Sequence, residues 1–193
     1  MNRIVLGGIL GGLVLFGWSA IAHMPPLGTA GLRMLPPAAE DAAIAALRGA
    51  MHERAIYILP GIDPTRSQTP EEQQAWMTRF EAGPATVVAY NPHPAERAHV
   101  GSAFTTWFAI EFAGDIFVAL VAALIASSFS RSLGYWPRVL LVAALGLIAT
   151  VDVDLSYWNW YAFPTLYFLA QLADHVGGWF LTGLVLARVC RPA

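Results

Sequence analysis

The chain has 193 residues, of which 56% are hydrophobic and 12% are charged, and its net charge at pH 7 is −2. Soluble domains carry about 25% charged residues, so this composition favours an integral membrane protein. The small negative net charge provides no basic surface for nucleic acid, and the single cysteine, Cys190, excludes an internal disulfide, a CxxC pair and a cysteine-based zinc site.

Hydrophobic residues are concentrated in four segments, each of which is long enough to form a membrane-spanning helix. A span needs roughly 20 apolar residues to cross about 30 Å of hydrocarbon. The predicted spans are residues 4–22, 103–128, 137–155 and 164–189. The first segment ends in Ala20-Ile21-Ala22, which also fits a signal-peptidase site, but its paired glycines favour a retained helix.

Between the first two spans lies a polar segment, residues 23–102, for which we expect a small α+β domain. The predicted elements are a helix over 36–51, a strand over 55–59, a helix over 69–83 and a strand over 85–90. The second of these helices begins with a capping box, Thr69-Pro70-Glu71-Glu72. About eighty residues are too few to bury a large core, so we expect this domain to rest on the bilayer or on a partner.

The arginines near the ends of the spans predict how the chain is oriented. They all fall on one side of the predicted spans: Arg3, Arg131, Arg138, Arg188 and Arg191. Because loops rich in Lys and Arg stay in the cytoplasm, both termini are expected there and residues 23–102 are expected to be extracytoplasmic. The predicted fold is mainly α: a four-transmembrane-helix bundle in the bacterial inner membrane, in contact with the lipid bilayer.

An aromatic stretch, TVDVDLSYWNWYAFP at residues 150–164, follows the third apolar segment. Tyr157, Trp158, Trp160 and Tyr161 are typical of the aromatic belt at headgroup level. Pro164 can begin the returning helix, where a missing N–H costs nothing. We interpret the stretch as an interfacial hairpin and not as a catalytic motif.

Four glycines in the first span form two overlapping GxxxG patterns, Gly7 with Gly11 and Gly8 with Gly12. Such spacing lets another helix backbone approach closely. The pattern predicts a helix-packing interface. It leaves open whether that interface is with the other spans, with another membrane protein or with a second copy.

Ionisable and amide side chains also occur within the apolar segments. The predicted buried polar cluster consists of Glu111, Asp115, Asp152, Gln171, Asp174 and His175. At 1.5 Å per residue, Glu111 would lie roughly 12 Å and Asp115 roughly 18 Å into the second span. An acid at the centre of a helix costs roughly 2.5–3.5 kcal/mol and is a functional candidate by default. With no arginine at that depth, we expect at least one of Glu111, Asp115 and Asp174 to be neutral at pH 7.

Three roles for this cluster remain open. It can hold the spans together by hydrogen bonds, carry protons or cations, or bind a metal through Glu111, Asp115, Asp174 and His175, since carboxylates with imidazole suit iron, manganese or zinc. The cluster lacks the Glu-x-x-His pairs of di-iron bundles, so no cofactor is expected and a metal has no specific motif. Copper is a weaker alternative for a set with irregular spacing: His23, Met24, Met34, Met51, His52, His93 and His99.

Three pieces of the chain, WSAIAHM (18–24), SYWNWYAFP (156–164) and ADHVGGWFLTGLVLA (173–187), together resemble small four-span bacterial inner-membrane proteins of unassigned function. The resemblance implies a topology and a location and no reaction. Four-span thiol oxidases carry cysteine pairs that are absent here. Lipoprotein signal peptidases carry asparagine-bearing motifs around their aspartates, and these motifs are also absent.

From these patterns we predict a non-catalytic accessory, scaffold or assembly subunit for another membrane component. The alternative is a small proton- or cation-conducting protein that uses the buried carboxylate and histidine cluster. A metal-dependent membrane enzyme is a weaker alternative.

Overall fold

The computed structural model describes residues 2–94 and 100–191, with the side chains of residues 100–104 left out. Residues 95–99 lie outside the described residues. They include His99 and belong to the C-terminal end of the predicted polar segment, residues 23–102.

The chain forms two compact units. We call residues 1–32 together with 100–193 the helical unit, and residues 33–99 the small unit. Residues 23–32, which we predicted as the start of the polar segment, belong to the helical unit. The reason is local: the backbone of Gly31 lies against Tyr167 and takes a positive φ of 79° that glycine tolerates.

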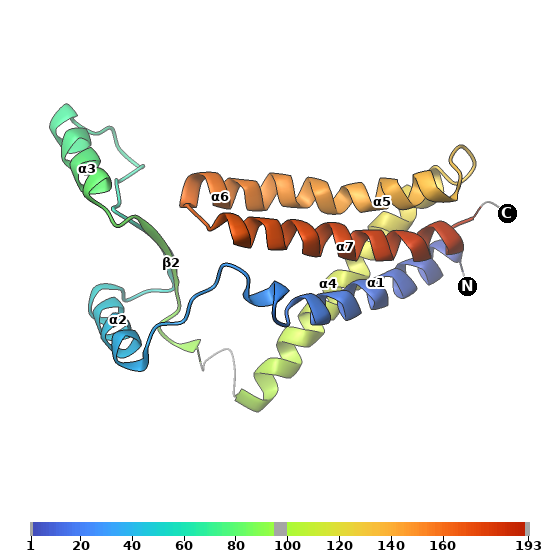
Figure 1. Ribbon diagram of the computed structural model, residues 1–193, viewed down its shortest axis with the longest axis horizontal. Helices are drawn as coiled ribbons and strands as arrows, with labels where there is room; N and C mark the ends of the chain where they lie inside the picture. The colour runs from blue at the N-terminus through green and yellow to red at the C-terminus, as the bar shows by residue number, and fades with distance from the viewer. Residues whose placement is uncertain (1, 95–99, 192–193) are drawn as a thin grey trace. The chain divides into compact units, whose positions relative to one another are not determined.

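The helical unit is built mainly from long helices, and short connections join α4 to α5 and α6 to α7 (Figure 1). They are α1 (Arg3–Ala22), the short 3₁₀ turn η1 (Leu27–Thr29), α4 (Val100–Ser128), α5 (Tyr135–Ala149), the π-helical segment η3 (Thr150–Asp154), α6 (Leu155–Tyr161) and α7 (Thr165–Val189). Three of the described helices are long and apolar enough to cross a membrane: Arg3–Ala22, Thr105–Ser128 and Tyr135–Tyr161. The predicted fourth span, α7, has 25 residues but is not among these three. It carries Gln171, Asp174 and His175 in its first half, which lower its apolar character.

Helix α1 packs against both α4 and α7, while α5 runs along α7 (Figure 1). Four of the five glycines of α1, those of the GxxxG patterns, lie at these contacts. A Cβ on Gly8 would lie 2.8 Å from Cα of Leu120, and a Cβ on Gly12 would lie 2.7 Å from Cα of Ile116, so this pair allows close approach of α4. Gly7 and Gly11 face Leu186 of α7 in the same way. The small residues therefore bring three helices of one chain together.

The end of the helical unit that carries both chain termini, which we call the terminal end, has a dry core of small apolar residues. Its members come from α4, α5 and the C-terminal part of α7: Ala122, Ala123, Ala126, Val142, Leu186 and Cys190. Arg138 is 5% exposed beside this core and donates from Nη1 to the main-chain oxygen of Cys190 at 2.8 Å. The guanidinium therefore satisfies a carbonyl at the end of α7, where the helix dipole favours a cation.

The third span extends further than residue 155, where we predicted its end. The helix continues through the π segment η3 into α6 and ends only at Tyr161. Ala162 then takes a left-handed φ of 55°, and Pro164 precedes the first residue of α7. No helix-breaking residue occurs before this point, so the aromatic residues lie on a helix and the connection is a short turn.

The small unit contains two helices and a two-stranded sheet: α2 (Pro37–Ala50), β1 (Ala55–Leu59), α3 (Pro70–Ala82) and β2 (Thr86–Tyr90). The strands are antiparallel, with Tyr57 opposite Val88. The predicted capping box of α3 is present, and Gly83 ends the helix with a φ of 60°. Within the described part of this unit only Met51 is fully buried, so the unit has little core of its own.

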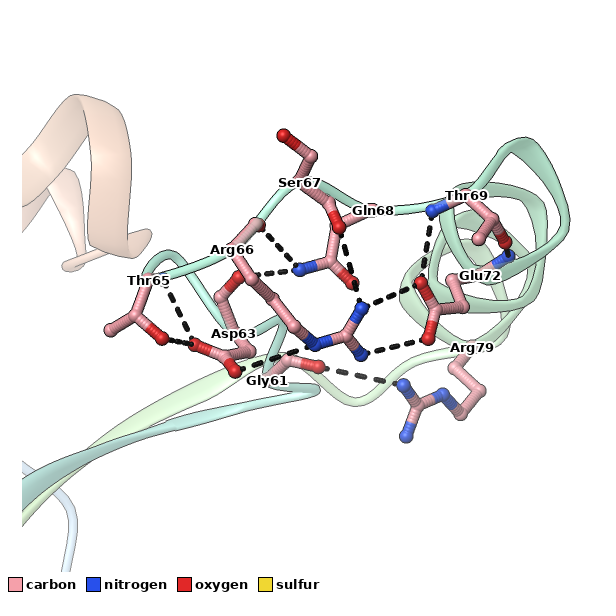
Figure 2. A network of polar contacts seen from close by, with 9 residues as sticks. All are labelled: Gly61, Asp63, Thr65, Arg66, Ser67, Gln68, Thr69, Glu72 and Arg79. Carbon is pink, nitrogen blue, oxygen red and sulfur yellow. Dashed lines mark hydrogen bonds and ion pairs between the residues drawn. The ribbon is translucent and has the colours of Figure 1, made fainter.

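A polar network organises the loop that precedes α3 (Figure 2). Arg66 donates to both carboxylate oxygens of Glu72, at 3.0 and 2.7 Å, and Asp63 accepts from the backbone N–H and the hydroxyl of Thr65. Glu72 also accepts from the backbone N–H of Thr69 at 2.9 Å. The hydrogen bonds from Arg66 and then from Thr69 lower the pKa of Glu72 to about 2. The polar groups of this network hydrogen-bond to one another, so we assign the network a structural role.

Candidate functional site

A cavity of about 270 Å³ lies between α1, α4 and α7, at the end of the helical unit opposite the terminal end. We call it the polar cavity. Its polar lining residues are Ser19, His23, Glu111, Asp115, Gln171, Asp174 and His175, and indole rings of Trp18 and Trp179 complete the wall. Five of the six residues of the predicted polar cluster therefore lie around one space, although they come from two helices that are far apart in sequence.

Asp115 is the most buried acid of the polar cavity, with 9% of its surface exposed. Its Oδ2 atom is buried and has no hydrogen-bond partner in the described structure. Glu111 lies one helical turn earlier on α4 and is exposed at the edge of the same cavity. Leaving a buried acceptor without a donor costs about 1–3 kcal/mol, and more when it is charged, so this carboxyl group needs either a proton or a donor.

Asp174 is held by a residue that the sequence analysis did not single out. Trp18 of α1 donates from Nε1 to Oδ1 of Asp174 at 2.8 Å and to its main-chain oxygen at 2.9 Å. The indole can lie against α7 because Gly177 and Gly178 have no side chains: a Cβ on either would come within 2.8 Å of the ring. This contact fixes one carboxylate of the polar cavity and joins α1 to α7.

His175 is oriented by two residues of the π segment. The hydroxyl of Thr150 donates to the main-chain oxygen of Gly146 at 2.9 Å, and the same oxygen atom lies 3.0 Å from Nδ1 of His175. A hydroxyl has only one proton to donate, so Thr150 accepts from Nδ1, which must carry the proton. Nδ1 also lies 3.3 Å from Oδ2 of Asp154. The nitrogen left for the polar cavity is Nε2, which is an acceptor when the ring is neutral.

The π segment turns a different aspartate inward from the one that we predicted. Asp152, predicted in the buried cluster, is exposed and does not line the polar cavity. Asp154 is instead buried, with 6% exposed, and contacts His175. A π turn places one extra residue in the helix, which shifts the following side chains around the axis. The sequence showed no signal for this turn, and Thr150 was missed for the same reason.

A second, larger cavity of about 580 Å³ adjoins the polar cavity, and we call it the apolar cavity. It is lined by Phe16, Ala20 and Met24 and by Trp107 and Phe108 of α4. Ser19, His23 and Glu111 belong to both linings, so the two cavities meet at these residues. The ring of Phe16 packs edge-on against Phe108 and Phe112, with centroids 6.4 and 5.4 Å apart.

The acids of the polar cavity do not converge as metal ligands do. In residues 2–94 and 100–191, no three His, Cys, Asp or Glu side chains come together in a way that could hold a metal ion. The geometry thus gives no support to the predicted set of Glu111, Asp115, Asp174 and His175 as a metal centre. Among the copper candidates, Met51 is buried in the small unit and His23 belongs to the cavities of the helical unit, so these two lie in different units.

Comparisons with protein-family models, curated proteins and solved structures found no match to this chain. The resemblance to small four-span membrane proteins therefore stays a prediction. The function has to be argued from the two adjoining cavities and the residues that line them.

Proposed function

We propose that this chain is a four-span inner-membrane protein without catalysis of its own, which binds another membrane component in the polar cavity. The observation that carries this proposal is the carboxylate of Asp115, which is buried, faces the cavity and has an oxygen without a donor in the described structure. An assembly role through the glycine face of α1 has less support, because Gly7, Gly8, Gly11 and Gly12 already contact α4 and α7.

The packing below the polar cavity favours binding over conduction. Residues 116–126 of α4, which follow Asp115 toward the terminal end, contain no polar side chain. Ala122, Ala123 and Ala126 from this stretch belong to the dry core. A conduction path needs polar groups or water through the whole membrane, whereas the acids among the described residues of the helical unit are gathered in one half.

The arginines support an orientation in which the polar cavity belongs to the extracytoplasmic half. Arg3, Arg138 and Arg188 lie at the terminal end, near the ends of α1, α5 and α7. By the positive-inside rule this end faces the cytoplasm, and His23 and Glu111 then lie toward the other side.

The test is native mass spectrometry of protein extracted from membranes in a mild detergent. Wild-type protein should carry a bound mass beyond the polypeptide, and Asp115→Leu should lose it. Asp152→Leu, which removes an exposed acid from the same unit, should keep it. A bare chain in every wild-type preparation would overturn the proposal.

A second measurement addresses conduction directly. Liposomes that contain the protein and a pH-sensitive dye should show the same proton leak as liposomes without it. A leak that Asp115→Asn abolishes, in a variant that still folds, would replace binding by the proton-conducting alternative.

A further inference from the structure

We infer that the guest of the polar cavity is an amphiphile with a primary ammonium head and an aliphatic tail, the tail lying in the apolar cavity. The inference rests on the proposed function and adds the chemical class of the bound component. Its basis is the junction of two cavities of opposite character at Ser19, His23 and Glu111.

The charge of the polar cavity favours a cationic head. Three carboxylates, Glu111, Asp115 and Asp174, line the cavity, and no arginine is among the lining residues. The buried guanidinium of Arg138 is committed to the carbonyl of Cys190 at the terminal end. A cation entering the cavity would therefore meet acids without a competing positive charge, which is the arrangement that ionic recognition requires.

The donors and acceptors of the polar cavity favour a cation with N–H groups over one without them. The indole N–H of Trp18 is already used by Asp174, and Nδ1–H of His175 faces Thr150 and Asp154. Oδ2 of Asp115 still lacks a donor. A guest with N–H groups would supply a donor to this carboxyl group. A primary ammonium has three donors, whereas a quaternary ammonium of equal charge has none, so the cavity should prefer the former.

The apolar cavity accounts for the tail of the guest. Its volume of about 580 Å³ falls within the range of small-molecule sites. Phe16, Phe108 and Trp107 supply aromatic walls, on which an alkyl chain can pack by burying apolar surface. Because Ser19, His23 and Glu111 line both cavities, a molecule with its head beside these residues would have the apolar cavity next to it for its tail.

The experiment measures binding of dodecylammonium to the full chain in phosphatidylcholine nanodiscs, using the fluorescence of the tryptophans that line the cavities. Dodecyltrimethylammonium, with the same tail and charge but no N–H, is the comparison probe. We expect dodecylammonium to bind at least about tenfold more tightly, since hydrogen bonds to a charged group contribute about 1.5–3 kcal/mol. Equal affinity for the two probes would overturn the inference.

Two variants separate the head from the tail. Asp115→Asn should weaken dodecylammonium binding about tenfold, and Asp152→Asn should leave it unchanged. Phe108→Ala, which keeps the acids, should reduce the advantage of dodecylammonium over hexylammonium. If Asp115→Asn fails to fold, the chain-length comparison in Phe108→Ala decides: an unchanged advantage would overturn the placement of the tail.

A primary ammonium can come from a lipid headgroup or from a free amine. Native mass spectra of protein incubated with phosphatidylethanolamine, with its N,N-dimethyl derivative or with dodecylamine distinguish these sources. Wild-type protein from membrane extracts could carry a bound mass that none of these amines displaces. That result would overturn this inference and leave the proposed function intact. Absence of any bound mass would overturn both.

Discussion

The indole nitrogen of Trp18 lies 2.8 Å from Oδ1 of Asp174, so the first and last helices of the chain meet at a carboxylate of the polar cavity. The ring lies against Gly177 and Gly178, which leave space for it. One side chain therefore does two things: it packs α1 on α7, and it fixes the position of an acid that would otherwise be free to rotate.

Replacement of this indole should separate the hydrogen bonds from the packing. Trp18→Phe keeps an aromatic ring but loses the one N–H that both oxygens of Asp174 share, and should lower the free energy of unfolding by about 1 kcal/mol, the usual range for hydrogen bonds between membrane helices. Unfolding in mixed micelles measures the effect. Trp160→Phe is the matched control, since Trp160 is 77% exposed. Equal effects in the two variants would show that the Trp18 contact contributes nothing.

The glycines of α1 offer a sharper comparison, because Gly12 and Gly17 lie on the same helix. A Cβ on Gly12 would come within 2.7 Å of the Ile116 backbone, so Gly12→Ala should force α1 and α4 apart and lower the thermal midpoint. Nothing lies within 4 Å of the corresponding position on Gly17. Gly17→Ala should therefore be neutral or raise the midpoint, as Ala exceeds Gly in helix propensity by up to about 1 kcal/mol in water.

Arg138 should contribute to stability through one buried hydrogen bond. Arg138→Met leaves the main-chain oxygen of Cys190 without its donor and should cost about 1–3 kcal/mol, measured by denaturant unfolding. Arg131→Met removes the same charge from an exposed position nearby and controls for changes in membrane orientation. A loss of stability in Arg131→Met as large as that in Arg138→Met would contradict the role given to the buried bond.

The loop before α3 should loosen in acid. Protonation of Glu72 removes its ion pair with Arg66, and the pKa of Glu72 falls from 4.5 to about 2 on folding. Because the folded pKa is the lower one, the stabilisation is present above pH 4.5 and is lost as the pH falls toward 2. The amide proton shift of Thr69, which donates to Glu72, reports the change by NMR. Glu72→Gln should remove this pH-dependent change in the Thr69 amide shift. If the change persists in the variant, another titrating group causes it.

Much of the local structure could be predicted because it depends on residues that are close in sequence. The capping box at Thr69 and Glu72, the stop at Gly83 and both strands of the small unit follow from short patterns. The three apolar helices follow from hydropathy alone. Asp174 and His175 follow Gln171 by three and four residues, and this spacing alone places the three side chains on one side of a helix.

The remaining features depend on how the helices pack. The π turn at Thr150–Asp154 brings Asp154 inward in place of Asp152, and no composition or period in the sequence indicates such a turn. The GxxxG spacing in α1 is the same whether its partner is internal or external. The role of Trp18 depends on the packing of α1 against α7, which the sequence does not show. The Gly177-Gly178 pair is the one local signal, because two adjacent small residues can leave space for a large side chain from another helix.

The apolar core beneath Asp115 divides the helical unit into two chemically different halves. Among the described residues of this unit, every acid lies on the side of the polar cavity, and the packing of Ala122, Ala123, Val142 and Leu186 begins beyond them. In the orientation proposed above, this apolar layer stands between the acids and the end that carries the arginines.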